Sequence, residues 1–314
     1  MSSRNLVMGL VFLSQTIIGI LGNFSLLYHY LFLYFSGCRL RRTTDLILQH
    51  LIVANSLVLF SKGVPQTVAA LGWKQFPSDY GCKILYYIYR VGRGVSISST
   101  CLLSIFQAII ISPRNSRWAD IKMKAPRYIS LSTSLCWLLY MLVNIIIPIY
   151  VTGNWRNDTF KKKKDLGYCS SQVGEKSKVP LYAALFSFSD ALCLGLMLWA
   201  SGSMVSILYR HKQRVQHIHR TNLSPRSSPE SRATHTILLL VSTFVSFYTV
   251  SCIFQICLAV FDHPSWLLVN MAALFSVCFP TVSPFVLMGR DSIVSILCFA
   301  WVRKTNSPNL ISNT

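Results

Sequence analysis

Three ionisable side chains lie inside otherwise apolar stretches of the sequence: Arg90, Arg93 and Asp190. Arg90 and Arg93 are three residues apart, so on a helix they share one face. A charged side chain at the centre of a bilayer costs roughly 2.5–3.5 kcal/mol on insertion scales, so each needs a buried partner or a water-filled cavity. The three groups therefore predict either a ligand cavity that they line, or an arginine–Asp190 ion pair that fixes helix packing.

The depths of these residues along their segments support the idea that they meet. Arg90 and Arg93 follow Cys82 by eight and eleven residues, which is roughly 12 and 16 Å of helix at 1.5 Å per residue. Asp190 follows Pro180 by ten residues, or roughly 15 Å by the same rise. Similar depths predict that the three groups lie close together, whether they line a cavity that opens to the outside or form an ion pair.

The segments that must position these residues are long and apolar. The chain is 52% hydrophobic and 13% charged, with a mean hydropathy of +0.46, more apolar than a soluble core requires. A bilayer core needs about 20 helical residues, and barrel strands would alternate polar and apolar residues. The sequence therefore predicts an all-α membrane protein, a seven-transmembrane helix bundle in one domain, with 289–314 as a cytoplasmic tail. The predicted spans are 6–33, 46–70, 81–111, 128–151, 179–209, 234–260 and 266–288.

The charge distribution predicts orientation and partners. The net charge of +20 lies in loops between apolar runs, which indicates a membrane surface and no nucleic-acid partner. Arg4 precedes the first span, whereas Arg39, Arg41 and Arg42 follow it. The positive-inside rule then places the N-terminus outside and the C-terminus in the cytoplasm of a multi-pass plasma-membrane protein. The run of lysines at 161–164 opposes this rule because it falls on the predicted outer face.

Covalent signals in the loops agree with this orientation. Cys82 and Cys169 stand out as loop cysteines on one side of the membrane. The acceptor triplet that begins at Asn157 would lie on that same outer side, where glycosylation occurs. A second triplet at Asn222 would lie in the cytosol and stay unused.

A further set of residues could act as pivots for switching. Asn23, Asn55 and Ser283 are polar groups in apolar spans, and Pro280 and Pro284 should kink the seventh span because proline removes backbone donors. Pivoting and simple packing remain equally good explanations of these five residues.

Signatures of catalysis are missing from the sequence. It contains no G-x-x-x-x-G-K phosphate loop, no H-E-x-x-H zinc pair and no G-x-S-x-G elbow, so we expect no enzyme activity, no cofactor and no metal site. The halves are not duplicated, which argues against common secondary transporters. The seventh span has no lysine for a retinal Schiff base. A membrane receptor is the best-supported class.

Several stretches are similar to vomeronasal type 1 receptors. They are 22–23 (GN), 50–55 (HLIVAN), 63–67 (GVPQT), 89–108 (YRVGRGVSISSTCLLSIFQA), 111–118 (ISPRNSRW) and 279–288 (FPTVSPFVLM). The resemblance implies a G-protein-coupled receptor of sensory neurons for pheromone-like small molecules. It also implies a Cys82–Cys169 disulfide and glycosylation at Asn157.

The resemblance further implies coupling to a heterotrimeric G protein, of the inhibitory class. Its expected contacts are the basic residues of the inner loops, which could equally hold the chain at anionic lipid: Arg114, Arg117, Lys122, Lys124, Arg210, Lys212 and Arg214. The sequence departs from the broader rhodopsin-like pattern, with Ser283 in place of asparagine before Pro284. Vomeronasal receptors share that departure. Gly92 stands where they commonly have alanine, and we expect it to loosen the helix locally. The alternatives are a receptor for a tastant or hormone, and a transporter or channel.

Overall fold

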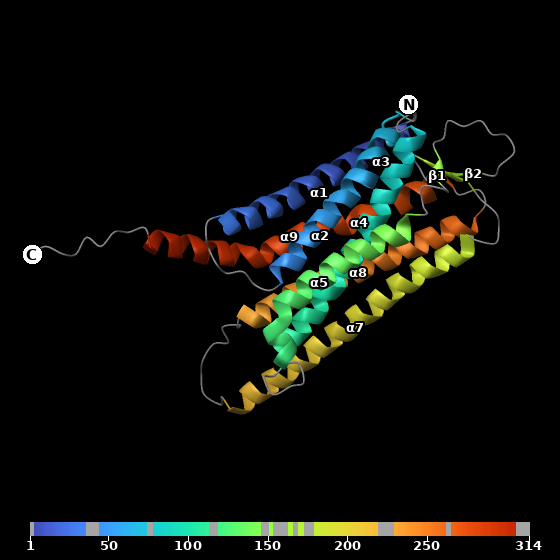
Figure 1. Ribbon diagram of the computed structural model, residues 1–314. Helices are drawn as coiled ribbons and strands as arrows, with labels where there is room; N and C mark the ends of the chain where they lie inside the picture. The colour runs from blue at the N-terminus through green and yellow to red at the C-terminus, as the bar shows by residue number, and fades with distance from the viewer. Residues whose placement is uncertain are drawn as a thin grey trace, which may run out of the picture.

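The computed structural model describes most of the chain. The described ranges are 3–35, 44–73, 78–112, 119–145, 151–152, 163–165, 169–172, 179–218, 229–261 and 265–305. Long helices run side by side along one axis (Figure 1). The N-terminus and the strands lie at one end of this bundle, and the end of the last helix lies at the other.

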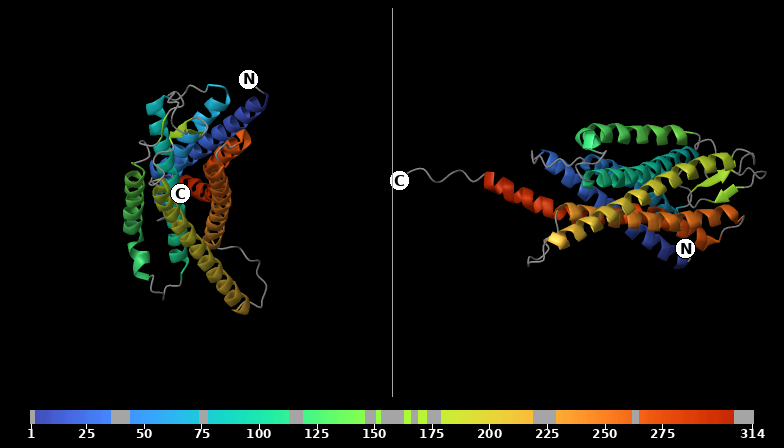
Figure 2. Two further views of the ribbon diagram at one scale, coloured as in Figure 1. Left: turned by 90° about the vertical axis from the view of Figure 1, so that its right-hand side faces the viewer. Right: turned by 90° about the horizontal axis from the view of Figure 1, so that it is seen from below.

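The helices correspond to the predicted apolar segments. Their bounds are Ser3–Phe35 (α1), Asp45–Val58 (α2), Val64–Ala70 (α3), Asp79–Ile111 (α4), Ala119–Asn144 (α5), Val179–Ile218 (α7), Pro229–Val260 (α8) and Trp266–Thr305 (α9), with a π-helical turn, η1, at Leu59–Gly63. Among the described residues, six stretches are long and apolar enough to cross a membrane, and α5 is not one of them. The side chains of α5 are described from Arg127 to Asn144, and hydroxyl side chains interrupt its apolar residues. The predicted seven-helix bundle is confirmed, with α5 at its edge in both views of Figure 2.

Several helices in the structure begin or end at other residues than the predicted spans, as α7 does at Ile218 and α8 at Pro229. The fourth span was predicted at 128–151, but α5 ends at Asn144 and Val151 belongs to a strand. Pro148 follows shortly after the helix end, and a proline disfavours helical conformation in the residue before it. Among the described residues, the stretch of α9 that is apolar enough to cross a membrane is Trp266–Met288, as predicted, and the helix itself continues to Thr305.

The second predicted span, 46–70, contains α2, η1 and α3 rather than one regular helix. Pro65 has no backbone N–H, so the carbonyl four residues earlier loses its helical partner. The wider η1 turn at Leu59–Gly63 takes up this break immediately before Pro65. Gly63 lies at its end, and its carbonyl accepts a hydrogen bond from Thr67 Oγ1 at 2.8 Å.

Three short strands lie outside the all-α prediction. They are Val151–Thr152 (β1), Lys163–Asp165 (β2) and Ser170–Gln172 (β3), and they form an antiparallel sheet of order β1-β3-β2. Val151 pairs with Ser171, and Lys164 pairs with Ser171 from the other side. The sheet lies at the end of the bundle that holds the N-terminus (Figure 1).

Helix α4 is the centre of the bundle, because it packs against α2, α5, α7 and α8. Three of its buried hydroxyl groups are bonded within the helix itself. Ser98, Thr100 and Ser104 each donate to the carbonyl four residues earlier, at 2.9–3.1 Å. These three hydroxyl groups therefore lie in the core of the bundle with their donors satisfied.

Candidate functional site

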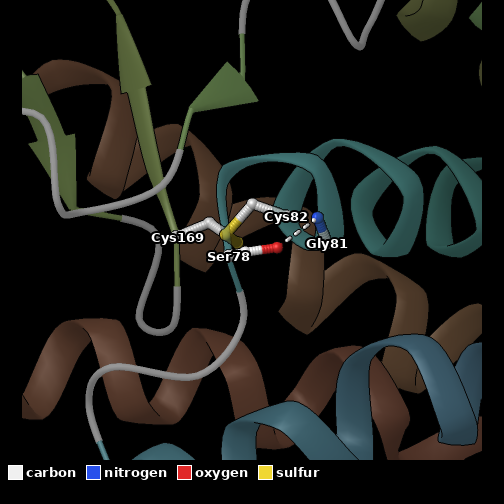
Figure 3. The surroundings of a disulfide bond; sticks show 4 residues. All are labelled: Ser78, Gly81, Cys82 and Cys169. Atoms are coloured by element: carbon white, nitrogen blue, oxygen red, sulfur yellow. Dashed lines mark hydrogen bonds between the residues drawn. A yellow bond between two sulfur atoms is a disulfide. The ribbon is translucent and has the colours of Figure 1, made fainter.

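The N-terminal end of α4 is covalently fixed. Cys82 on α4 and Cys169 beside β3 form a disulfide with a sequence separation of 87 residues, and both are fully buried. Figure 3 shows this bond next to the start of α4, where the Ser78 side chain accepts a hydrogen bond from the Gly81 N–H at 3.3 Å. Linking residues so distant in sequence restricts the unfolded chain and holds the strands over the end of the bundle. Asn157 lies outside the described residues.

Arg93 is the centre of a polar cluster between α4 and α8. Its Nη1 donates to Tyr89 Oη at 3.3 Å and to Ser251 Oγ at 3.4 Å. Its Nη2 lies 4.0 Å from Cys252 Sγ. The guanidinium also lies over the ring of Tyr248, 4.7 Å from its centroid, a cation–π arrangement.

Asp190 joins this cluster through Tyr248 and not through an arginine. The hydroxyl of Tyr248 on α8 donates to the Asp190 carboxylate on α7. Within the described part of the chain, Arg93 and Asp190 do not form a direct ion pair. Tyr248 thus presents its ring to the cation and its hydroxyl to the carboxylate, and it links α4, α7 and α8. Arg93 and Asp190 therefore lie in one cluster with a phenol between them, and not as the expected direct ion pair.

Arg90 lies about one turn nearer the start of α4, partly buried and with contacts of its own. It does not line the small cavity beside Arg93. Of the three ionisable residues singled out in the sequence, the structure therefore places two in one cluster.

A fourth ionisable residue, Lys62, was missed. It lies in η1, is 8% exposed, and its Nζ lies 5.7 Å from the centroid of the Tyr89 ring. Tyr89 thus contacts Lys62 through its ring and Arg93 through its hydroxyl. The rule that any charge within an apolar span needs a partner would have found Lys62 from the sequence.

The cavity beside Arg93 has a volume of about 30 Å³. Arg93, Ser96 and Ser251 contribute polar groups to its lining, and much of the remainder is aromatic: Phe244, Phe247, Tyr248, Phe275 and Phe279. Ligand sites usually enclose several hundred Å³, so a ligand requires these side chains to move apart. The lining comes mainly from α4, α8 and α9.

The residues predicted to switch form contacts between helices. Asn55 on α2 donates from Nδ2 to Ser283 Oγ on α9 at 2.9 Å, and its Oδ1 accepts from Ser96 Oγ on α4 at 2.8 Å. Asn23 on α1 donates to the Pro280 carbonyl on α9 at 2.9 Å. We refer to Asn55, Ser96 and Ser283 as the three-helix latch. Proline frees backbone carbonyls in α9, and Asn23 uses the carbonyl of Pro280 itself.

Glycines let the helices approach closely at these contacts. A Cβ on Gly22 would lie 3.1 Å from the Cβ of Pro284, and one on Gly92 would lie 3.1 Å from the carbonyl oxygen of Ala54 on α2. Helix α4 is continuous through Gly92. The effect of Gly92 is therefore close packing against α2 rather than a local loosening.

Gly94 gives a testable case of this packing. A Cβ there would overlap the ring of Tyr140 on α5, whose hydroxyl lies 3.1 Å from Ser189 Oγ on α7. We expect Gly94→Ala to lower the unfolding free energy by about 1–3 kcal/mol through overpacking. Thermal denaturation of the purified protein measures this. Gly202→Ala is the matched control, because a Cβ there meets nothing within 4 Å and alanine favours helix. Equal melting temperatures for both variants would contradict the prediction.

The predicted inner basic residues are only partly described. Arg210 is exposed on α7. Lys122, Lys124, Lys212 and Arg214 lie on α5 and α7 in parts where only the backbone is described, and Arg114 and Arg117 lie outside the described residues.

Comparison with known proteins gives one consistent result. The family described as "Vomeronasal organ pheromone receptor family" matches residues 6–300. The chain is 60% identical to the human protein "Vomeronasal type-1 receptor 4" over 96% of this chain and 100% of that protein. It is 60% identical to human "Vomeronasal type-1 receptor 2" over 93% of this chain and 74% of that protein. A zebrafish protein (Danio rerio), "Olfactory receptor class A-like protein 1", is 30% identical over 91% of this chain and 89% of that protein.

Proposed function

Since the chain belongs to the vomeronasal type 1 receptor family of chemosensory G-protein-coupled receptors, we propose that its ligand binds beside Arg93, Tyr248 and Asp190. The observation that carries this proposal is the cluster itself. A cation, a carboxylate and the phenol between them lie within the apolar bundle on three different helices. Ionisable groups at such a depth are expensive and usually serve a substrate or ligand. A ligand that alters one of these contacts acts on α4, α7 and α8 together.

The signal reaches the inner side through the same helices. The cavity borders Ser96 and Pro280, and Ser96 belongs to the three-helix latch. A ligand that binds a wider arrangement more tightly than the closed one shifts the population toward it. Because α4 and α9 both line the cavity and both carry latch residues, widening the cavity strains the Asn55 contacts. The latch then serves as the switching element.

The orientation we propose has the N-terminus outside and the C-terminus in the cytoplasm. The disulfide supports it, since disulfides persist on the oxidising side of the membrane. The sheet beside this disulfide lies at the same end of the bundle as the N-terminus (Figure 1). Asn157 then lies outside, where it is glycosylated.

At the inner end, the basic residues predicted from the sequence contact a G protein of the inhibitory class. Arg210 supports this part of the proposal, because it is exposed on α7. The same charges hold the inner loops near anionic lipid, at about 1 kcal/mol per basic residue near the surface.

The test uses the full-length receptor in lipid nanodiscs with purified G proteins. Ligand should accelerate nucleotide exchange on an inhibitory-class G protein more than on a stimulatory one. Asp190→Asn should raise the ligand concentration that gives half-maximal nucleotide exchange, after correction for the amount of folded receptor. Movement of labelled solute into vesicles without any G protein would instead favour a transporter. If the unaltered receptor and Asp190→Asn give equal ligand responses per folded receptor, the cluster stabilises helix packing and does not bind the ligand.

A further inference from the structure

The lining of the cavity beside Arg93 combines one charged residue and a few hydroxyl groups with apolar side chains. Arg93 is its one charged lining residue in the described part of the chain, and three serines, Ser96, Ser251 and Ser276, add hydroxyl groups. The rest of the lining is apolar and largely aromatic. A molecule that enters would bury an apolar body against rings and place one polar group near the guanidinium.

Among the described residues, two N–H groups of the guanidinium are left for such a group: one on Nη2, and the one on Nε, whose nitrogen has no partner at all. Its Nη atoms contact Tyr89, Ser251 and Cys252. The Nε atom is buried, and among the described residues nothing accepts a hydrogen bond from it. A buried donor of a charged group without an acceptor costs more than the usual 1–3 kcal/mol, so an acceptor at this position stabilises the site strongly.

The charge of Arg93 is already matched. Asp190 is connected to it through Tyr248, whose ring faces the cation and whose hydroxyl bonds the carboxylate. The two other cations of this region, Lys62 and Arg90, do not line the cavity and make contacts of their own. A ligand with a full negative charge would therefore add an unmatched charge at low dielectric. A neutral acceptor oxygen would satisfy Nε–H without that penalty.

We propose that the ligand is a compact, neutral, largely apolar molecule with one acceptor oxygen, a ketone or ester carbonyl, which accepts a hydrogen bond from Arg93 Nε. This inference rests on the ligand position proposed above and adds the chemical class. A cavity of about 30 Å³ has room for about one water molecule. The apolar body must therefore displace the aromatic side chains of α8 and α9. That displacement gives the ligand a higher affinity for an opened arrangement, which is the condition for activation.

The experiment compares molecules of one shape that differ in their polar group. The panel contains medium-ring cyclic ketones, the hydrocarbons of the same ring size, and the corresponding cycloalkane carboxylates. Full-length receptor in nanodiscs is examined by thermal stabilisation, which needs no G protein, and by nucleotide exchange on the G protein. We expect ketones to bind about 10- to 100-fold more tightly than the hydrocarbons, as for loss of one hydrogen bond to a charged group. Carboxylates should bind more weakly than ketones.

Two variants connect this preference to the residue. Arg93→Lys keeps the positive charge and lacks Nε–H, so the ketone preference should fall to less than about threefold. Lys83→Gln is the control, since Lys83 lies outside the cavity and pairs with Asp79 at 3.4 Å. If Arg93→Lys does not fold, the relative affinities of the unaltered receptor for ketones, hydrocarbons and carboxylates still test the proposed ligand class.

The outcomes separate the two proposals. Equal affinity for ketones and hydrocarbons, tighter binding of carboxylates, or no stabilisation by any ketone overturns the inference about ligand class, even if other compounds drive nucleotide exchange. An unchanged ketone preference in a folded Arg93→Lys receptor overturns it as well. Ketone-specific stabilisation without any nucleotide exchange supports the ligand class and contradicts the proposed signalling.

Discussion

Asp190→Asn is expected to destabilise the receptor by about 3 kcal/mol, the lower end of the range for removing one partner of a buried charge pair. The carboxylate is linked to the Arg93 charge through Tyr248, so the asparagine leaves a cation in the bundle without its counter-charge. Arg93→Gln in the Asp190→Asn background should recover much of this loss, because the double variant contains no unmatched charge. Thermal denaturation of all four receptors in detergent gives the coupling between the two positions.

Tyr248→Phe is the matched control for this cycle. It keeps the ring that faces Arg93 and removes only the hydroxyl that bonds Asp190. Its expected cost lies well below that of Asp190→Asn, since both charges remain in place. Additive effects of Asp190→Asn and Arg93→Gln would show that Tyr248 does not couple them, and the cluster would then consist of independent polar groups.

Much of the fold could be predicted from the sequence because the interior of a bilayer permits few backbone conformations. A backbone that crosses a bilayer must satisfy its hydrogen bonds internally, so long apolar stretches become helices. The same rule does not apply beyond the hydrocarbon. The strands beside Cys169 and the continuation of α9 to Thr305 therefore escaped the hydropathy pattern. The η1 turn escaped as well, although Pro65 marks its position in the sequence.

The candidate site was predictable only in part. Charge within an apolar span identified Arg93 and Asp190, and helical rise gave them similar depths. Tyr248 carries no charge and is unremarkable in an apolar span, so its role between them depends on how α8 is rotated. The rule that a charge within an apolar span needs a partner would also have identified Lys62. The size of the cavity depends on side-chain packing that the sequence does not display.

Asn55→Leu is expected to lower stability by about 1–3 kcal/mol, because it breaks two hydrogen bonds between helices, each worth about 0.6–1.7 kcal/mol in membrane proteins. The amide bonds Ser96 on α4 and Ser283 on α9, and all three residues are buried. In the Asn55→Leu background, Ser96→Ala and Ser283→Ala should each become nearly neutral. Denaturation of the single and double variants measures this.

The same variant should raise basal nucleotide exchange on the G protein. The latch holds an arrangement whose cavity of about 30 Å³ is too small for a ligand, so this arrangement is the resting one. Weakening it by one or two kcal/mol changes the balance between resting and open arrangements by about 5- to 30-fold. Asn144→Leu is the control. Asn144 is also buried, but within the described residues its amide donates only to the Tyr140 carbonyl of its own helix, at 2.7 Å. Equal basal exchange in both variants would mean that Asn55 contributes packing alone, because only Asn55 joins α2 to α4 and α9.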